Sequence, residues 1–347
     1  MVFEVTQPEE AKQAVTSAPT LEMVAARAGV SRSTVSRVVN SSPQVTADVV
    51  AIVNAAIAEL GYVPNRAARS LASRRTYSIA LVIPENTAKF FSDPYFAAVI
   101  QGAANFLSDS DYVLNLLIGS PGDELKTLRY VERGNVDGAL VLSHHTDDGV
   151  YLKLGNSLPV VFGGRPTGAE TDDAYYVDID NIDAGTAATR HLIDRGRTRI
   201  ATIAGPQDMS AGMDRIAGWR AALSDAGLEP GPIEVGDFTP TGGADAMRRL
   251  LERNEDFDGL FVASAQMASG ALGVLREAGR SVPGDLGVAT VDNDYFAINA
   301  VPPLTAIEQP TQQQGAKMAE MLLDIIEGRP VDKHATIATT LIVRDSA

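Results

Sequence analysis

The sequence contains no cysteine, no long apolar run and little positive charge. The absence of cysteine from all 347 residues excludes disulfides, thiolate catalysis and cysteine-based zinc sites, and it fits a reducing compartment. No apolar stretch approaches the length of a membrane span. The first eighteen residues hold three Glu, one Lys and no apolar core segment. We therefore expect a flexible tail at 1–18, no ordinary secretory signal and a cytoplasmic protein.

The charge of the chain is unevenly distributed. The net charge is −15, which taken as a whole argues against binding to nucleic acid. Between Pro19 and Thr76, however, seven Arg stand against three acidic residues, so this segment carries +4 and the remainder carries −19. A basic segment on an acidic chain predicts a protein that touches phosphates with one end only.

Residues 19–62 predict a compact unit of three short helices. Apolar residues at helical spacing place these helices at about 21–28, 32–40 and 47–60. A candidate N-cap precedes each helix, and a glycine follows the first and the third: Thr20, Ser31 and Thr46, then Gly29 and Gly61. The short connection between the first two helices has the length of a helix-turn-helix.

The second predicted helix carries residue types that read DNA. Three valines at 35, 38 and 39 share one face, and the opposite face is polar: Arg32, Ser33, Ser36 and Arg37. Arg binds guanine through two hydrogen bonds, and Ser and Thr hydroxyls suit phosphates or either base type. An ordinary solvated helix face can carry the same residues, but the ordered three-helix pattern with this turn favours DNA reading.

The stretch TLEMVAARAGVSRSTVSRVVN…VTADVVAIVNAAIAELGYVPNRAARSLASRRT resembles the headpiece of the LacI/GalR family of bacterial transcription regulators. By this resemblance the second helix reads bases, and residues 63–77 form a hinge helix that orders on operator DNA beside its twin in a dimer. Leu71 matches a leucine that wedges into the minor groove, although spacing alone would favour a core leucine. The DNA-contacting residues implied are Thr20, Ser31, Arg32, Ser33, Thr34, Arg37, Asn40, Asn65, Arg66, Arg69 and Leu71.

From residue 78 onward, short apolar runs alternate with helical stretches in two series of roughly a hundred residues each. Alternating strands and helices predict βαβ units with parallel sheets, and continuous apolar strands predict sheets covered on both faces. The expected fold class is therefore α/β behind an all-α headpiece. The family resemblance implies a two-subdomain core like that of periplasmic binding proteins.

The expected boundaries follow from this pattern and from the resemblance. The helix-turn-helix headpiece spans 19–62, the hinge 63–77 and the effector-binding core 78–347. The first subdomain comprises about 78–177 and 308–328, and the second about 178–307 and 329–347. The chain is expected to cross between them near 176–178, 305–309 and 327–330.

Candidate effector residues lie where loops follow predicted strands. Sugar sites use Asp, Asn and Arg to hydrogen-bond hydroxyl pairs, and aromatic rings to cover C–H faces. By the family resemblance these residues are Asp93, Tyr95, Phe96, Ser143, Arg215, Trp219, Phe238, Ser264 and Asp292. Each has a structural alternative: Trp219 and Phe96 can be core residues, and Arg215 can form a surface ion pair. We favour the functional interpretation for Arg215 and Asp292, and the core for Trp219.

The sequence departs from the family pattern inside this site. Ser264-Ala265 stands where an Asn/Ser-Asp pair is usual, Thr290 replaces a glycine, and Asp292-Asn293 replaces a double Asp. These changes put in doubt any ligand inferred from the family average. The aromatic residues and the polar first wall favour a carbohydrate, specifically a di- or oligosaccharide.

No catalytic constellation is present. The neighbouring His144 and His145 point different ways and suit a polar cleft wall better than a metal, and no H-E-x-x-H, G-x-S-x-G or Walker A sequence occurs. We expect no cofactor, no metal and no enzyme activity. A sugar-binding transport protein and an α/β enzyme are the alternatives. The headpiece favours a regulator over both.

The resemblance also implies an assembly. We expect a homodimeric repressor on double-stranded, pseudo-palindromic operator DNA, in which the effector changes hinge spacing and so operator affinity. The helix predicted at 311–328 packs in the core and lines the dimer interface. No heptad-bearing tail follows TTLIVRDS, so we expect dimers and not tetramers.

Overall fold

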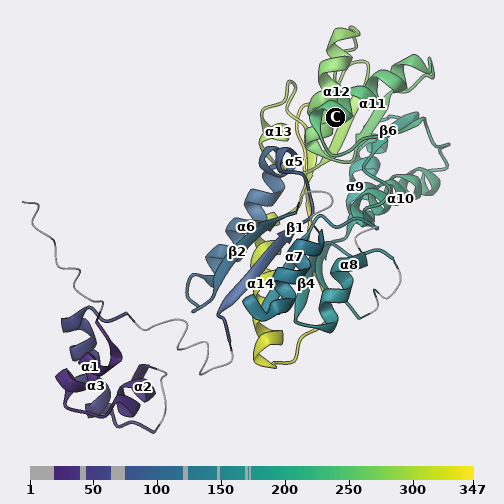
Figure 1. Cartoon of the computed structure of the whole chain (residues 1–347). Coiled ribbons are helices and arrows are strands. Elements are labelled where there is room, and N and C mark those ends of the chain that lie inside the picture. Colours follow the sequence, from purple (N-terminus) through teal and green to yellow (C-terminus); the bar gives the residue numbers. More distant parts are fainter. Residues whose placement is uncertain are drawn as a thin grey trace, which may run out of the picture. The chain divides into compact units, whose positions relative to one another are not determined.

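The computed structural model describes residues 19–39, 44–63, 75–119, 124–146, 149–168, 171 and 173–347. The chain divides into two compact units, a small one that ends at Thr76 and a large one that begins at Tyr77 (Figure 1). Within the described ranges, no helix is both long enough and apolar enough to cross a membrane.

The small unit is a bundle of three helices. They are α1 (Leu21–Ala28), α2 (Arg32–Val39) and α3 (Ala47–Leu60), close to the predicted ranges. The Thr20 side chain accepts the backbone N–H of Met23, and Gly29 ends α1 with φ 66°. The left-handed backbone at Gly29 suits a residue without a Cβ atom. Thr46 is the N-cap residue of α3, as predicted, although its side chain makes no capping hydrogen bond.

One side chain from each helix forms the centre of the small core. Val24, Val35 and Val53 are fully buried and lie in one apolar cluster. At the surface Arg27 joins α1 to α3, with its Nη2 2.6 Å from a carboxylate oxygen of Glu59. The valines of α2 therefore face inward, as predicted, and its polar side is left for solvent or a partner.

The large unit contains two six-stranded sheets, each forming one lobe (Figure 1). The first sheet has the order β11-β5-β4-β3-β1-β2, and all its strand pairs are parallel. Its strands are β1 (Ser78–Ile83), β2 (Val113–Ile118), β3 (Gly138–Leu142), β4 (Val160–Gly163), β5 (Tyr175–Ile179) and β11 (His334–Ile337). Its helical segments are α5 (Thr87–Ser92), α6 (Pro94–Leu107), α7 (Glu124–Tyr130), η1 (Val131–Asn135), α8 (Gly149–Leu152), η3 (Lys153–Asn156) and α14 (Thr311–Glu327).

The second sheet has the order β12-β10-β9-β8-β6-β7, and only β12 is antiparallel to its neighbour. Its strands are β6 (Ile200–Ala204), β7 (Ile233–Val235), β8 (Gly259–Val262), β9 (Gly287–Val291), β10 (Thr305–Glu308) and β12 (Thr340–Ile342). Its helices are α9 (Asn181–Asp194), α10 (Ser210–Asp225), α11 (Pro240–Glu252), α12 (Ala265–Glu277) and α13 (Tyr295–Ile298).

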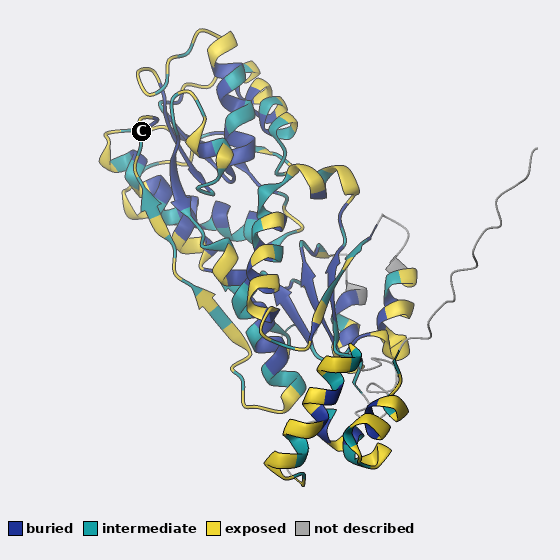
Figure 2. Cartoon of the chain, turned by 90° about the vertical axis from the view of Figure 1, so that its left-hand side faces the viewer, coloured by how far each residue is buried: buried dark blue, intermediate teal, exposed yellow. Residues whose placement is uncertain are grey.

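The central strands are buried between helices, and the outer faces of the helices are exposed (Figure 2). β3, β6, β8 and β9 are buried at every position, which explains their continuous apolar sequences. The predicted α/β class with parallel sheets is confirmed.

The chain crosses between the lobes three times, and one crossing differs from the prediction. β5 leads to α9, and β10 leads to α14, both close to the expected positions. The third crossing lies between β11 and β12, not at 327–330. His334–Ile337 pair with β5 and thus still belong to the first lobe. A strand of four residues with alternating exposure carries too weak an apolar pattern to reveal its sheet.

Candidate functional sites

The polar side of α2 is exposed and preorganised by its own hydroxyl groups. Ser31 accepts the backbone N–H of Thr34 at 3.1 Å, which caps the helix. Its hydroxyl also lies 2.7 Å from that of Ser33. Arg32 contacts Glu22 at 3.1 Å, and both side chains are largely exposed. Arg37 is exposed as well. Exposed ion pairs contribute little to stability, so Arg32 can exchange its partner for a phosphate or a base at low cost.

The remaining predicted DNA contacts lie outside the described residues. They are Asn40, Asn65, Arg66, Arg69 and Leu71. Thr20 is engaged as the cap of α1, and Thr34 lies beside Ser31, with their hydroxyl oxygens 2.9 Å apart.

A cavity of about 550 Å³ lies between the two lobes of the large unit. Ser143 follows β3, Ser264 follows β8 and Asp292 follows β9, so residues from both sheets reach it from the carboxyl ends of their strands. Ligands of open parallel sheets bind at this edge. The volume is that of a small-molecule site.

Three residues of the cavity wall have strained backbones. Ser143, Phe238 and Asp292 have φ of 54°, 65° and 79°, in the left-handed region that residues with a Cβ atom rarely adopt. All three line the cavity. Strain of this kind persists where the surroundings enforce it, typically at binding sites.

Arg215 is the buried cation of the cavity. Its Nε donates to Asn181 at 2.9 Å, and its Nη1 donates to the carbonyl of Ala263 at 2.7 Å. The guanidinium also lies 5.9 Å from the centre of the Phe238 ring. Only 5% of the residue is exposed, so the surface ion-pair alternative is wrong. The remaining N–H groups of Arg215 are fixed in direction by these contacts.

Carboxylates from both lobes line the cavity: Asp93 comes from the first lobe, and Asp292 and Asp294 come from the second. Burial raises the pKa of Asp93 to about 6, and the charge of Asp292 adds to the rise. Burial and the same charge raise the pKa of Asp294 to about 7. Burial also raises the pKa of Asp292, although Arg215 and a hydrogen bond from Gln309 oppose this. The site is rich in acceptors for hydroxyl donors and repels anions.

All but one of the predicted effector residues line the cavity. Those that do are Asp93, Tyr95, Phe96, Ser143, Arg215, Phe238, Ser264 and Asp292. Trp219 is fully buried in the core cluster of the second lobe, on the side of α10 that packs against α9 and the sheet. It is not part of the cavity wall, and we leave it out of the proposed site.

Several polar residues of the wall were not predicted. They are Lys89, Asp178, Asn181, Gln266, Asp294, Gln309 and Gln314. Asp178 lies in β5 and Asn181 begins α9 at the first crossing, so the hinge itself supplies part of the site. The sequence could have indicated Asp178 and Asn181, because polar residues end an apolar strand there. Gln314 lies on α14 and gave no such signal.

Two residues that differ from the family pattern, Ser264 and Thr290, have structural roles. Ser264 caps α12 by accepting the backbone N–H of Met267 at 3.3 Å. Thr290 is fully buried within β9 and donates to the carbonyl of Val262 at 2.9 Å. Gln266 and Asn293, close to these positions in the sequence, also line the cavity.

Comparison with known proteins decides the family. Residues 20–65 match the model of bacterial regulatory proteins of the lacI family, and residues 189–347 match the periplasmic binding protein-like domain. The transcriptional regulator CelR of Thermobifida fusca is 47% identical over 333 residues, covering 94% of this chain and 98% of CelR. The chain belongs to the LacI family. The family expectation and the coarse prediction of a transcriptional regulator are thereby confirmed.

Solved structures of LacI-family regulators support the same fold. The CelR–cellobiose complex has a TM-score of 0.76 at 45% identity, covering 95% of this chain and 100% of that structure. The lac repressor dimer bound to operator and the anti-inducer ONPF has a TM-score of 0.81 at 25% identity, covering 94% and 98%. These relatives are LacI-family regulators and not enzymes.

Proposed function

We propose that this LacI-family regulator is a cytoplasmic homodimeric repressor whose effector is a neutral β-linked disaccharide or short oligosaccharide of the cellobiose type. The observation that carries the proposal is the cavity between the lobes. Arg215, Asp292 and Phe238 combine hydroxyl-binding groups with an aromatic face there. Carboxylates outnumber cations in the wall, which disfavours phosphorylated and acidic sugars. CelR, similar over nearly the whole chain, forms a complex with cellobiose.

The first experiment is a thermal-shift screen of the full chain with glucose, cellobiose, longer cello-oligosaccharides and glucose 6-phosphate. A ligand at about one hundred times its dissociation constant adds roughly 2.7 kcal/mol to the free energy of unfolding. We expect cellobiose or a longer homologue to raise the melting temperature and glucose 6-phosphate to leave it unchanged. An unchanged melting temperature with every neutral sugar, or an increase with glucose 6-phosphate alone, would contradict the proposed effector class.

We also propose that α2 reads the major groove. Arg32, Ser33 and Arg37 would contact bases, while Ser31, Thr34 and Thr20 lie near helix N-termini where phosphates bind. Asn40 would add a further DNA contact, Asn65, Arg66 and Arg69 would lie near phosphates, and Leu71 would wedge into the minor groove at the operator centre. Two copies would occupy two half-sites. The lac repressor, a dimer on its operator, supports this assembly.

Arg37→Ala separates base reading from phosphate contact. Loss of a two-hydrogen-bond contact to guanine should cost about 1–3 kcal/mol on the operator. Binding to random DNA should fall much less. Fluorescence anisotropy with operator and random duplexes at one salt concentration measures both. Arg220→Ala, on the exposed side of α10, is the control. An equal loss on both duplexes would reduce Arg37 to a phosphate contact.

A further inference from the structure

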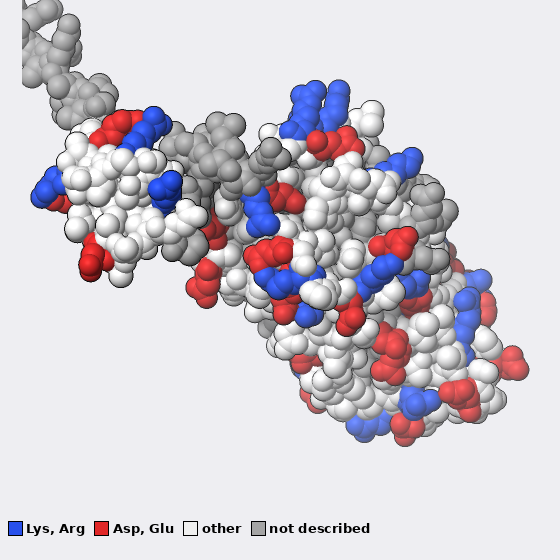
Figure 3. Space-filling model, turned by 90° about the horizontal axis from the view of Figure 1, so that it is seen from below, with Lys and Arg blue, Asp and Glu red and all other residues white. Residues whose placement is uncertain are grey.

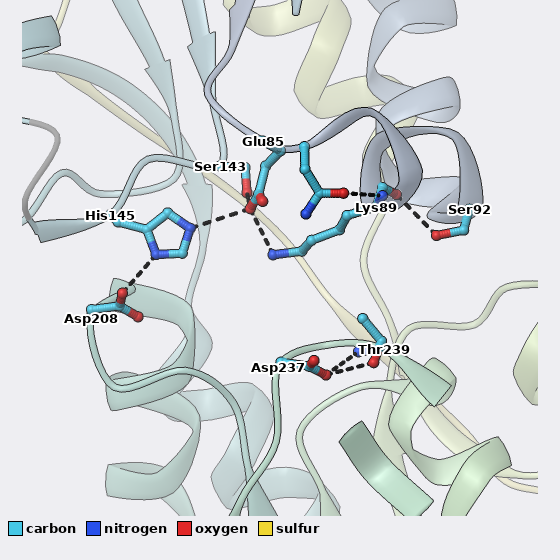
Figure 4. Close-up of polar contacts among 9 residues, drawn as sticks. Glu85, Lys89, Ser92, Ser143, His145, Asp208, Asp237 and Thr239 are labelled. Carbon is cyan, nitrogen blue, oxygen red and sulfur yellow. Dashed lines mark hydrogen bonds and ion pairs between the residues drawn. The ribbon is translucent and has the colours of Figure 1, made fainter. Parts of the chain in front are cut away.

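A buried carboxylate at the edge of the cavity binds three donors, one from α5 and two from the loop that follows β3. Glu85, in the loop between β1 and α5, is only 6% exposed. Its Oε1 accepts the Lys89 ammonium at 2.6 Å and the Ser143 hydroxyl at 2.6 Å (Figure 4). The same oxygen lies 3.3 Å from Nε2 of His145. Lys89 and Ser143 line the effector cavity, whereas Glu85 stands behind them.

The cost of burying Glu85 is met by these donors. Burial alone raises the pKa of Glu85, but hydrogen bonds from His145, Lys89 and Ser143, together with the charge of Lys89, lower it to about 2. An apolar residue would fill this position with no desolvation penalty, so a buried ion pair is poorly explained by stability. What the carboxylate does supply is a fixed direction for two polar groups of the cavity wall.

His145, the third donor to Glu85, also contacts the second lobe. Nδ1 of His145 lies 2.8 Å from the carboxylate of Asp208, which belongs to the second lobe between β6 and α10 (Figure 4). The next residue, Thr146, donates its backbone N–H to the carbonyl of Asp208 at 2.8 Å. His145 therefore connects a carboxylate behind the cavity wall of one lobe to a carboxylate of the other.

The geometry sets the protonation state of His145. Both ring nitrogens face carboxylate oxygens, and an imidazole can donate from both only when it is protonated. The hydrogen bond to Glu85, reinforced by Asp208, raises the pKa of His145 to about 9 against the cost of burial. Among the residues that the structure describes, the charged groups in contact with the ring include Glu85 and Asp208, and Lys89 in turn contacts Glu85. The adjacent His144 is buried, and burial lowers its pKa to about 4.

We propose that Glu85 and His145 are positioning residues for the effector: Glu85 holds Lys89 and Ser143 at the cavity wall, and His145 fastens this wall to Asp208 of the second lobe. The inference rests on the proposed sugar site. It adds residues that stand outside the cavity and act through others. Binding between two lobes requires both walls to be held at one separation, so contacts that fix this separation increase effector affinity.

The test is a double-mutant cycle on cellobiose affinity, measured by calorimetry with the full-length chain. His145→Gln and Asp208→Asn should each weaken binding about tenfold, the size expected for a charge-assisted hydrogen bond. The double variant should be no weaker than the worse single variant, because both changes break one contact. Asp225→Asn is the control, since it removes an exposed ion pair with Arg190 on the outer side of the same lobe. Glu85→Gln should weaken cellobiose binding at least as much as His145→Gln. If the Glu85→Gln variant folds poorly, the single variants at His145 and Asp208 still test the proposal.

A pH series distinguishes positioning from a general structural role. The loss caused by His145→Gln should be full near neutral pH and shrink as the pH rises through about 9, where the wild-type ring loses its second proton. Unchanged affinity in the variants, or losses that add, would overturn the positioning proposal while leaving the sugar site intact. A wild-type chain that binds no neutral sugar would overturn the proposed function itself, and this proposal with it.

Discussion

At the scale of single residues, the cavity is defined by polar groups that the fold buries and then fixes. The family resemblance predicts Arg215, and the structure shows what holds its side chain in place. A buried Arg must find acceptors, and Asn181 and the Ala263 carbonyl supply them. Trp219, four positions later, is equally buried but apolar, and spacing alone could not separate its side of α10 from that of Arg215.

Arg215→Lys should weaken cellobiose binding at least tenfold. A lysine ammonium cannot reproduce the planar donors that reach Asn181 and Ala263 while others face the cavity. Calorimetry of the variant measures the change. Arg220→Lys, exposed on the same helix, should bind like wild type. Equal affinity in Arg215→Lys and wild type would remove Arg215 from the site.

The carboxylates of the cavity should make the unliganded protein less stable as pH rises. The folded pKa of Asp294, about 7, lies above its ordinary value of 3.8, so ionisation is disfavoured in the folded state. This penalty is absent below about pH 4 and complete above about pH 7.

Asp294→Asn should therefore raise the melting temperature at pH 8 relative to wild type and change it little at pH 4, as a thermal unfolding series would show. Asn can retain the cap of α13 that Asp294 makes with the N–H groups of Phe296 and Ala297. Asp225→Asn, at an exposed site, is the control. A variant with the wild-type pH profile would show that Asp294 is not a source of this penalty.

At the scale of elements, close helix packing depends on glycines that the apolar pattern does not reveal. α6 and α14 pack against each other in the first lobe, and a Cβ atom added to Gly102 would lie 1.9 Å from the backbone oxygen of Gln312. Gly273, on α12, has nothing within 4 Å of such an atom. The same residue type thus plays opposite roles in two helices.

Gly102→Ala should lower the melting temperature by several degrees, because a backbone atom cannot move aside without separating the helices. Gly273→Ala should raise it slightly, since alanine favours helix by about 1 kcal/mol over glycine where space is free. Differential scanning calorimetry compares the two. Similar melting temperatures in both variants would contradict the close approach of α6 and α14.

Elements with strong local signals could be predicted, and those with weak signals could not. The helices α1 to α3 and the strands β1, β3, β6, β8 and β9, which are buried at every position except Ser78, correspond to runs that the sequence marks clearly. β7 has three residues and no buried position, and β11 pairs far along the chain with β5. Such short strands are defined by their sheet partners and not by their own sequence.

The residues of the cavity wall also differ in whether the sequence predicts them. Residues that follow strong strands, such as Ser143 and Asp292, could be predicted. Lys89 and Gln314 reach the cavity from helices, where the sequence does not show which side faces the cleft. Glu85 contacts Ser143 and His145, which lie 58 and 60 positions later in the sequence. Only the folded sheet brings these residues together.

At the scale of the whole molecule, the net charge differs between segments of the chain. On the face of the molecule seen in Figure 3, acidic and basic side chains alternate. The chain as a whole carries −15, while residues 19–76 carry +4. Attraction to DNA should therefore come from this segment alone, with the rest of the chain limiting non-specific binding.

The proposed function requires that an effector bound in the cavity changes the affinity of the small unit for DNA. The most direct test is a titration of the full chain bound to its operator, selected from a random duplex pool, with cellobiose and with glucose 6-phosphate, followed by fluorescence anisotropy. A coupling of about 1–3 kcal/mol predicts that cellobiose changes operator affinity roughly 5- to 150-fold, and that glucose 6-phosphate does not. Operator affinity that is the same with and without saturating cellobiose would contradict the claim that this cavity controls DNA binding.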